Sequence, residues 1–172
     1  MAAENKLIAV ELIKLEIAPV AATGFPTTGW EEIDYVHEET FQYNQTETST
    51  DPYRTVKGEV YHTDLTAGDT SIDVVIGNYS LRLKADLEGG TYTPATSTSG
   101  ATYTPPISPV LVYRAVRATT KDGVIIRFSN GQVIANATNN KKAIGQSIRF
   151  IPTRHPDPAT PAEDWNDGIP SA

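Results

Sequence analysis

Apolar residues alternate with polar ones along much of the chain, at the two-residue period that is typical of β-strands. In the first such segment, residues 6–17, the alternation changes phase part of the way along. Ile8, Val10 and Leu12 share one phase, and Ile13, Leu15 and Ile17 share the other. A strand with a bulge that switches its buried face fits this pattern, and an amphipathic helix is the alternative.

Further strands are expected before the middle of the chain, at residues 40–46, 55–62 and 66–77, and residues 30–36 predict a strand or a tight turn. Phe41 and Tyr43 would share one face of the 40–46 strand. In the 66–77 segment a turn at Ala67-Gly68-Asp69 would precede the strand, because glycine tolerates positive φ and aspartate bonds the local backbone. The apolar residues of that strand are in phase: Ile72, Val74 and Ile76.

Residues 78–90 break the strand pattern and predict the one helix, over about Ser80 to Glu88. Asn78 or Ser80 can cap its start, and Gly89-Gly90 can end it. Three leucines would line this helix: Leu83 and Leu87 on its inner face, with Leu81 beside them.

Residues 91–109 are low in complexity, and Thr-Tyr-Thr-Pro occurs in them twice. Prolines and small polar residues predict an extended surface loop, longer than a compact domain usually holds without a use for it. Contact with a neighbouring subunit is one such use, and disorder is the alternative.

The last third of the chain predicts strands again, at residues 110–119 and 148–151, with Pro152 stopping the second. Between them, residues 124–137 predict a hairpin, because Asn130-Gly131 is a favoured type I′ turn between alternating runs. The acidic, proline-rich residues 153–172 are expected to lie outside the fold as an arm. The sequence therefore predicts a mainly β domain over residues 1–152, an antiparallel β-sandwich or barrel with one flanking helix.

Composition narrows the possible functions. The chain has 172 residues, a net charge of −7 and no cysteine, which excludes disulfides and zinc-thiolate sites and argues against wrapping around nucleic acid. Charged residues interrupt the apolar N-terminal segment, so neither a signal peptide nor a spanning helix is expected. We therefore expect a soluble protein, made without export and without a membrane partner.

The charge is unevenly distributed. Residues 31–51 hold seven carboxylates and no base, whereas residues 52–154 hold seven acids and twelve bases. The seven carboxylates are Glu31, Glu32, Asp34, Glu38, Glu39, Glu47 and Asp51. A solvated face explains such a segment, but so does a face turned toward a basic neighbouring copy or toward a polyanion that must not bind.

No catalytic constellation is evident. His37, His62 and His155 lie in separate segments, and no third ligand stands at zinc spacing. His62 and Asp64 would share a strand face, which is the pattern of a surface pair more often than of a site. Nucleophile-elbow, phosphate-loop and dinucleotide-binding patterns are absent from the sequence. We therefore expect no enzyme, and we assign no catalytic, cofactor-binding or metal-binding residue.

The order of the elements resembles the major tail tube proteins of long-tailed bacteriophages. The resemblance covers residues 6–152 and depends most on TAGDTSIDVVIGNYSLRLKADLEGG and VIIRFSNGQVIANA. The same β-sandwich with a flanking helix is similar to tube proteins of contractile tails and of type VI secretion. The 91–109 insertion departs from the family pattern, in which the helix is followed closely by the next strand.

The resemblance implies a structural virion protein of the phage tail, assembled in the host cytoplasm into stacked, hexameric rings. The rings would contact other tail proteins at the tube ends and conduct DNA without binding it specifically. Residues 31–54 would form an acidic assembly hairpin, and the seven carboxylates named above are the candidates for the lumen or the ring interface. Two alternatives stay open: a virion-surface binding module that uses residues 91–109, and a small hydrolase that uses His62, Asp64 and a distant carboxylate.

Overall fold

The computed structural model of the chain describes residues 11–37, 39–77, 79–140 and 143–167. The described residues form one short helix and twelve strands, most of them in one antiparallel sheet. The elements are β1 (Leu12–Ala18), β2 (Glu31–Glu32), β3 (Gln42–Gln45), β4 (Ser49–Arg54), β5 (Val60–Thr66), β6 (Thr70–Ile76), α1 (Leu81–Glu88), β7 (Thr91–Thr93), β8 (Thr102–Thr104), β9 (Val112–Thr120), β10 (Ile125–Asn140), β11 (Ala143–Pro152) and β12 (Glu163–Asn166).

The main sheet has the strand order β2-β1-β9-β10-β11-β6-β3, and β12 pairs with β10 beside this path. β4 with β5, and β7 with β8, form two separate two-stranded ribbons. The prediction of a mainly β fold with antiparallel sheets and a single helix is confirmed. In the described part of the chain, no helix has the length and apolar character needed to cross a membrane.

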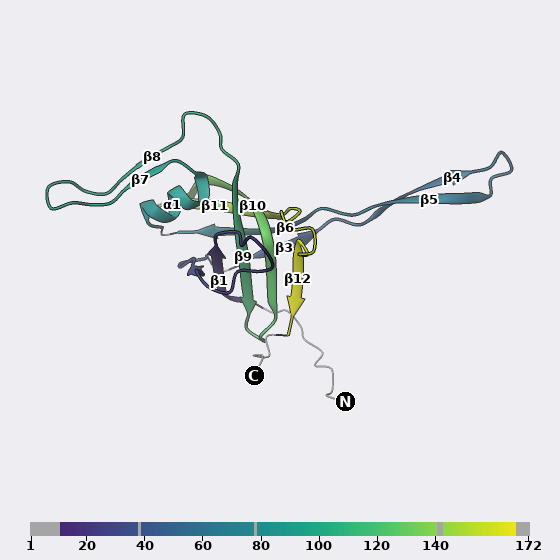
Figure 1. Ribbon diagram of the computed structural model, residues 1–172, viewed down its shortest axis with the longest axis horizontal. Coiled ribbons are helices and arrows are strands. Elements are labelled where there is room, and N and C mark those ends of the chain that lie inside the picture. The colour runs from purple at the N-terminus through teal and green to yellow at the C-terminus, as the bar shows by residue number, and fades with distance from the viewer. Residues whose placement is uncertain (1–10, 38, 78, 141–142, 168–172) are drawn as a thin grey trace.

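The sheet bends because β10 changes partner along its length. On one side β10 pairs with β9 from Ile125 to Val133. On its other side it pairs first with β12, from Ile125 to Phe128, and then with β11, from Gly131 to Asn140. The β9 register shifts between Phe128 and Gly131, which marks a bulge, and bulges bend and twist a strand. As a result β6 and β11 cross over β1 and β9, and the core lies between these two layers (Figure 1).

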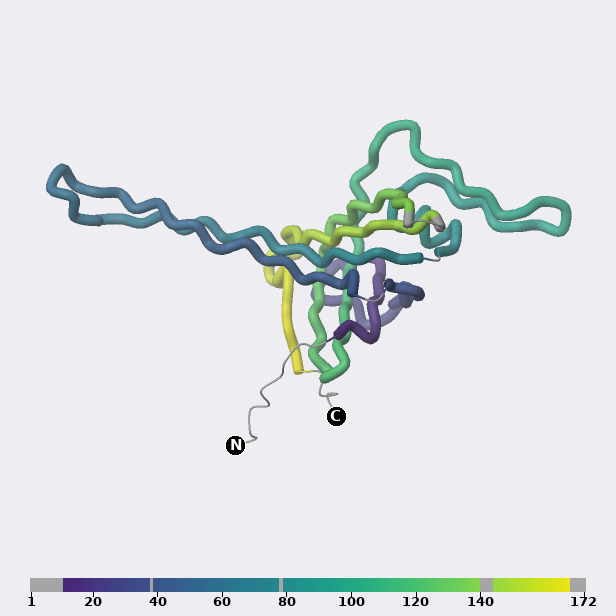
Figure 2. Tube along the Cα trace, turned by 180° about the vertical axis from the view of Figure 1, so that it is seen from behind, coloured from purple at the N-terminus to yellow at the C-terminus, as the bar shows by residue number. Residues whose placement is uncertain are grey.

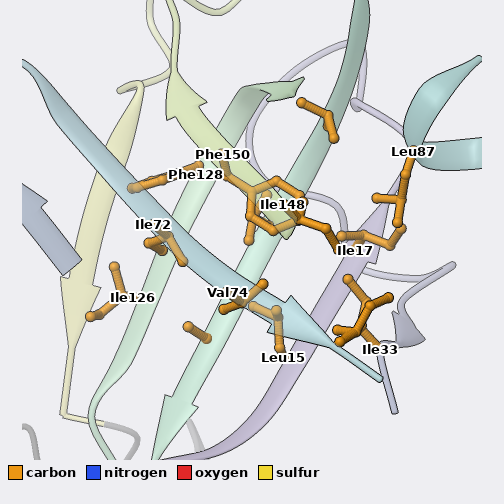
Figure 3. Close-up of a cluster of buried hydrophobic side chains, with 14 of the residues drawn as sticks. Leu15, Ile17, Ile33, Ile72, Val74, Leu87, Ile126, Phe128, Ile148 and Phe150 are labelled. Atoms are coloured by element: carbon orange, nitrogen blue, oxygen red, sulfur yellow. The ribbon is translucent and has the colours of Figure 1, made fainter. Parts of the chain in front are cut away.

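The core is filled by aliphatic and aromatic side chains from both layers (Figure 3). The residues that are at most 1% exposed include Leu15, Ile72, Val74, Ile76, Leu87, Val116, Ile126, Phe128, Ile148 and Phe150. The predicted phase of the 66–77 strand is confirmed, because alternate residues of β6 are buried. The predicted bulge in the first strand is also confirmed, since the β1–β9 register shifts between Leu12 and Lys14; Ile8 and Val10 lie outside the described residues.

Helix α1 covers one edge of the core and begins where the sequence predicts. The Ser80 hydroxyl accepts a hydrogen bond from the Leu83 amide at 3.0 Å, and Gly89 ends the helix with φ +77°. Leu83 and Leu87 are buried as expected, whereas Leu81 is 39% exposed. Asn78, the other candidate cap, lies outside the described residues.

The predicted hairpin turn at Asn130-Gly131 is wrong, because β10 runs through these residues without turning. A type I′ turn needs positive φ at both central positions, and neither residue has it. Distant backbone groups hold this segment extended instead: the side-chain amide of Asn130 donates to the Arg154 carbonyl at 2.9 Å, and the Thr153 backbone amide donates to the Asn130 carbonyl at 2.8 Å. A side chain at Gly131 would approach the Arg114 carbonyl to 3.1 Å.

The expectation that residues 153–172 lie outside the fold is also wrong for the residues described, 153–167. β12 pairs with β10, and His155 is only 2% exposed. The Glu163 carboxylate accepts a hydrogen bond at 2.7 Å from Tyr43, and burial together with this bond raises the pKa of Tyr43 to about 12. The edge of the Trp165 ring meets the Tyr43 ring with the centroids 5.0 Å apart. Residues 168–172 lie outside the described part.

Candidate functional site

The main projection from the body is one long hairpin, residues 42–76, which we call the arm. Its base belongs to the sheet, where β3 pairs with β6. Its outer part, β4 and β5, leaves the body as a two-stranded ribbon (Figure 1). The ribbon closes at residues 55–59, where the Thr55 amide donates to Glu59 at 2.8 Å and Gly58 has φ +85°. Every residue from Asn44 to Ala67 is exposed, so the ribbon has no packing against the body.

These bounds correct the expected 31–54 hairpin. The partner of β4 is β5, which lies beyond Arg54, and β3 pairs with β6. Residues 31–36 lie elsewhere: β2 pairs with β1, and Val36 bridges Ile76 of β6. Hydrophobic burial explains the difference, because Ile33 is 2% exposed and holds this stretch against the core. An assembly role for the hairpin stays a prediction.

The ribbon exposes five large apolar side chains: Tyr53, Val56, Val60, Tyr61 and Leu65. Val56 at the tip is fully exposed, and Tyr61 and Leu65 are 68% and 72% exposed. Tyr53 lies beside Tyr61 and His62, with ring centroids 6.4 Å and 5.6 Å away. A two-stranded ribbon is marginally stable alone in water, and its unpaired edges invite pairing with another chain. Side chains of this kind mark interaction surfaces when they gather on one element.

The two faces of the ribbon differ in charge, because side chains alternate along each strand and cross-strand partners share a face. One face carries Asp51 opposite Asp64, with the His62 ring nitrogen Nε2 2.8 Å from Asp64 Oδ1. The β4–β5 register shifts between Tyr53 and Arg54, and between this shift and the base the opposite face carries no charge: Thr50 lies opposite Leu65, and Pro52 opposite Thr63. The ribbon therefore has a charged face and an uncharged face.

The candidate carboxylates do not come together in one site. Glu31, Glu32 and Asp34 are exposed at the β2 edge of the sheet and line a groove of about 310 Å³ beside the start of α1. Glu39 is exposed near the base of the arm, and Glu47 and Asp51 lie on the arm itself. Glu38 lies outside the described residues. That these carboxylates face a lumen or a ring interface stays a prediction.

A basic cluster in the body lies beside the β2 acids. Lys14 Nζ is 2.9 Å from Glu16 and 3.7 Å from Glu32, and the Arg117 guanidinium donates to Glu16 at 2.7 Å. Arg117 also stacks on Trp30, 4.4 Å from the ring centroid. Burial acts to raise the pKa of Glu16, but the hydrogen bonds from Arg117 and Lys14 outweigh it, so this pKa lies below its ordinary value.

Glu16→Gln is expected to lower the free energy of unfolding by about 2 kcal/mol at pH 7, because it removes the buried carboxylate that pairs with Arg117. A depressed folded-state pKa stabilises the fold above the unfolded value of about 4.3, and this contribution is lost as the pH falls through the folded value. The difference between wild type and variant should therefore shrink below about pH 4. Urea titrations at pH 7 and pH 3 measure it.

Glu11→Gln is the matched control, because Glu11 pairs with Lys121 at 3.3 Å with both side chains well exposed. It should leave stability unchanged at both pH values. An equal loss at pH 3 and pH 7 for Glu16→Gln would show that shape, and not the carboxylate charge, explains the effect.

The residues of the hydrolase alternative are also on the arm. His62 and Asp64 make the expected contact, but their side chains are 60% and 54% exposed on the ribbon. Among the residues that the structure describes, no three acidic or histidine side chains gather to hold a metal ion. That the protein is not an enzyme stays a prediction.

Residues 91–109 form a second, smaller projection built on the β7–β8 ribbon, in which Tyr92 lies opposite Tyr103. The Tyr103 hydroxyl donates to the Glu88 carboxylate at 3.0 Å, which fixes this ribbon to the end of α1. Burial and this hydrogen bond raise the pKa of Tyr103 to about 12. Figure 2 shows the two projections extending in opposite directions from the body.

Comparisons with known proteins add a weak likeness. No family model matches the chain, and no curated protein matches it. A solved structure with similarity is the sheath/tube terminator of PVC, an extracellular contractile injection system, determined by cryo-EM in the extended state. It shares 10% identity at a TM-score of 0.42, over 96% of this chain and 99% of that chain. A TM-score this low does not establish a common fold.

Proposed function

We propose that the protein is a structural, non-catalytic tail subunit that assembles with copies of itself through the arm. The observation that carries this proposal is the wholly exposed β4–β5 ribbon with its exposed Tyr61 and Leu65. The core of the body is complete without the ribbon, since no residue between Ile33 and Ile72 is among the buried apolar residues. A folded body with a long unsupported ribbon fits a subunit whose ribbon is covered in an assembly.

The sequence resemblance to tail tube proteins supplies the form of the assembly that we propose. Copies would form stacked, hexameric rings of a virion tail, with other tail proteins at the tube ends. In such a ring, strand addition between neighbours satisfies the free edges of β4 and β5. The cost of holding a marginally stable ribbon away from the body is then offset by burial between subunits.

We further propose that the charged face of the ribbon turns toward the passage for DNA. Asp51 lies opposite Asp64 on this face, and like charges directly opposite each other destabilise an isolated ribbon. Toward DNA the same charges are useful, because carboxylates repel phosphates at close range. Screening limits this repulsion to about 8 Å at physiological salt, so carboxylates must line the passage directly. Glu47 and Asp51 are the arm residues among the sequence candidates.

Electron microscopy and light scattering of the purified protein test the proposal. At high protein concentration we expect rings or stacked rings with a central opening. A protein that stays monomeric across concentration, salt and pH would contradict the proposed function, because the arm would then need no second copy.

The same particles test the charged passage. A variant with Glu47→Lys and Asp51→Lys should still assemble, but its particles should retain DNA in a sedimentation assay where wild-type particles do not. Glu11→Lys is the control, because Glu11 lies outside the β4–β5 ribbon, where it pairs with Lys121 at 3.3 Å. Equal DNA retention by both variants would show that the arm charges do not face the passage.

A further inference from the structure

A second uncharged surface lies on the body at the base of the β7–β8 ribbon. Residues 91–111 contain no charged side chain. The chain returns from β8 to β9 through prolines and aliphatic residues that expose Ile107, Val110 and Leu111 by 106%, 55% and 66%. Together with Ile134 of β10, which is 41% exposed, these residues form a surface that we call the seat.

The seat is hollowed. A groove of about 300 Å³ runs between the return segment, the end of α1 and the middle of β10. Its lining includes Pro105, Pro109, Val110, Leu111, Val133 and Ile134. Its one carboxylate, Glu88, is already bound to Lys84, to Tyr103 and to the side-chain amide of Gln146. An occupant therefore meets an apolar groove with no free charge among the described residues, and burying apolar groups there requires no charge to lose water.

The geometry points to the uncharged face of the arm of a second copy as the occupant of the seat, which rests on the proposed self-assembly. Between the base of the ribbon and Tyr53, that face presents Thr50, Pro52, Thr63 and Leu65 and carries no charge. The opposite face of the ribbon carries Asp51 and Asp64, and burying those carboxylates on an apolar seat would be costly. Only one face of the arm therefore suits the seat.

One chain cannot make this contact with itself. The arm and the β7–β8 ribbon extend from opposite sides of the body, as both views show (Figures 1 and 2). The contact has to join the arm of one copy to the seat of the next. Such a head-to-tail contact is heterologous, and it closes into a ring when the rotation between copies allows. The charged face of each arm then stays turned away from the seat, which agrees with its proposed place along the passage.

Two substitutions test the pairing. Leu65→Asp places a charge on the uncharged face of the arm, and Leu111→Asp places one in the seat. Both side chains are well exposed in the single chain, so each variant should fold with an unchanged melting temperature. Each variant alone is expected to lose self-association by at least about 30-fold, as for an interface residue of large effect. Thr66→Asp, on the charged face of the same strand, should still assemble.

Mixing the two variants gives the decisive measurement. The Leu111→Asp copy keeps an intact arm and the Leu65→Asp copy keeps an intact seat, so one sound contact can form and no further copy can add. Light scattering should find a one-to-one complex of twice the 18.6 kDa chain mass. If the mixture remains two monomers, or if Leu111→Asp assembles like the wild type, this pairing is wrong while self-assembly through the arm stands. A monomeric wild type would overturn both.

Discussion

Removing the outer arm is expected to abolish self-assembly and to leave the body folded. The truncation replaces residues 47–68 with Asn-Gly. Thr46 and Asp69 are already hydrogen-bonded across the arm, with the Thr46 amide donating to the Asp69 carbonyl at 2.9 Å and the Asp69 amide to the Thr46 hydroxyl at 2.6 Å. Asn-Gly favours a type I′ turn and can join these two positions in register.

The melting temperature should change little, because the removed residues bury nothing against the core. Residues 44–67 are exposed throughout, and Tyr43, which contacts Trp165, is retained. Rings seen by electron microscopy for the wild type should be absent for the truncated protein. The matched control replaces residues 94–101, the tip of the other ribbon, with Asn-Gly and keeps Thr93 opposite Thr102; this protein should assemble. Rings from the truncated arm would contradict the proposed function.

The largest effect on stability is expected for Phe128→Ala, a loss of about 3–5 kcal/mol in the free energy of unfolding. Phe128 is 0% exposed, and it stands opposite Val116 of β9 and Glu163 of β12 where β10 bends. Its ring fills the space between the two layers (Figure 3), and a close-packed interior cannot collapse fully around the cavity. Against a typical total of 5–15 kcal/mol, the melting temperature should fall by about 10 °C.

Urea unfolding followed by tryptophan fluorescence measures this loss. Ile13→Ala is the control, because Ile13 is 61% exposed on β1 and its loss should stay within about 0.5 kcal/mol. A loss below about 1 kcal/mol for Phe128→Ala would mean that the bend in β10 is not held by core packing.

The candidate site was only partly predictable. The sequence predicted an acidic hairpin at residues 31–54, whereas the hairpin spans residues 42–76. It placed His62 and Asp64 on one face, where they meet at 2.8 Å. It missed Tyr61 and Leu65 as exposed arm residues, and the strand that it predicted over 55–62 begins only at Val60, because residues 55–59 form the turn of the ribbon. It also missed the seat, since the exposure of Leu111 depends on how the β8–β9 segment crosses α1 and β10. Exposure that depends on how distant segments pack cannot be predicted from the neighbouring residues in the sequence.

What the sequence by itself determined was local. The cap at Ser80, the glycine that ends α1 and the alternate burial of Ile72 and Val74 all follow from groups within four residues of each other. The bulge in β1 was predictable for the same reason, because the change of phase in the apolar alternation occurs between consecutive residues.

Only the tertiary structure decided which strands pair and which segments join the body. The predicted turn at Asn130-Gly131 does not form, because Asn130 is hydrogen-bonded to Thr153 and Arg154, more than twenty residues away. These long-range bonds and the pairing of β12 with β10 hold residues 153–167 against the body. The seven clustered carboxylates were separated because Ile33 must be buried at the core while the arm leaves it. The free energy of these long-range hydrogen bonds and of hydrophobic burial depends on surfaces that meet only after folding. It therefore cannot be predicted from a short stretch of sequence.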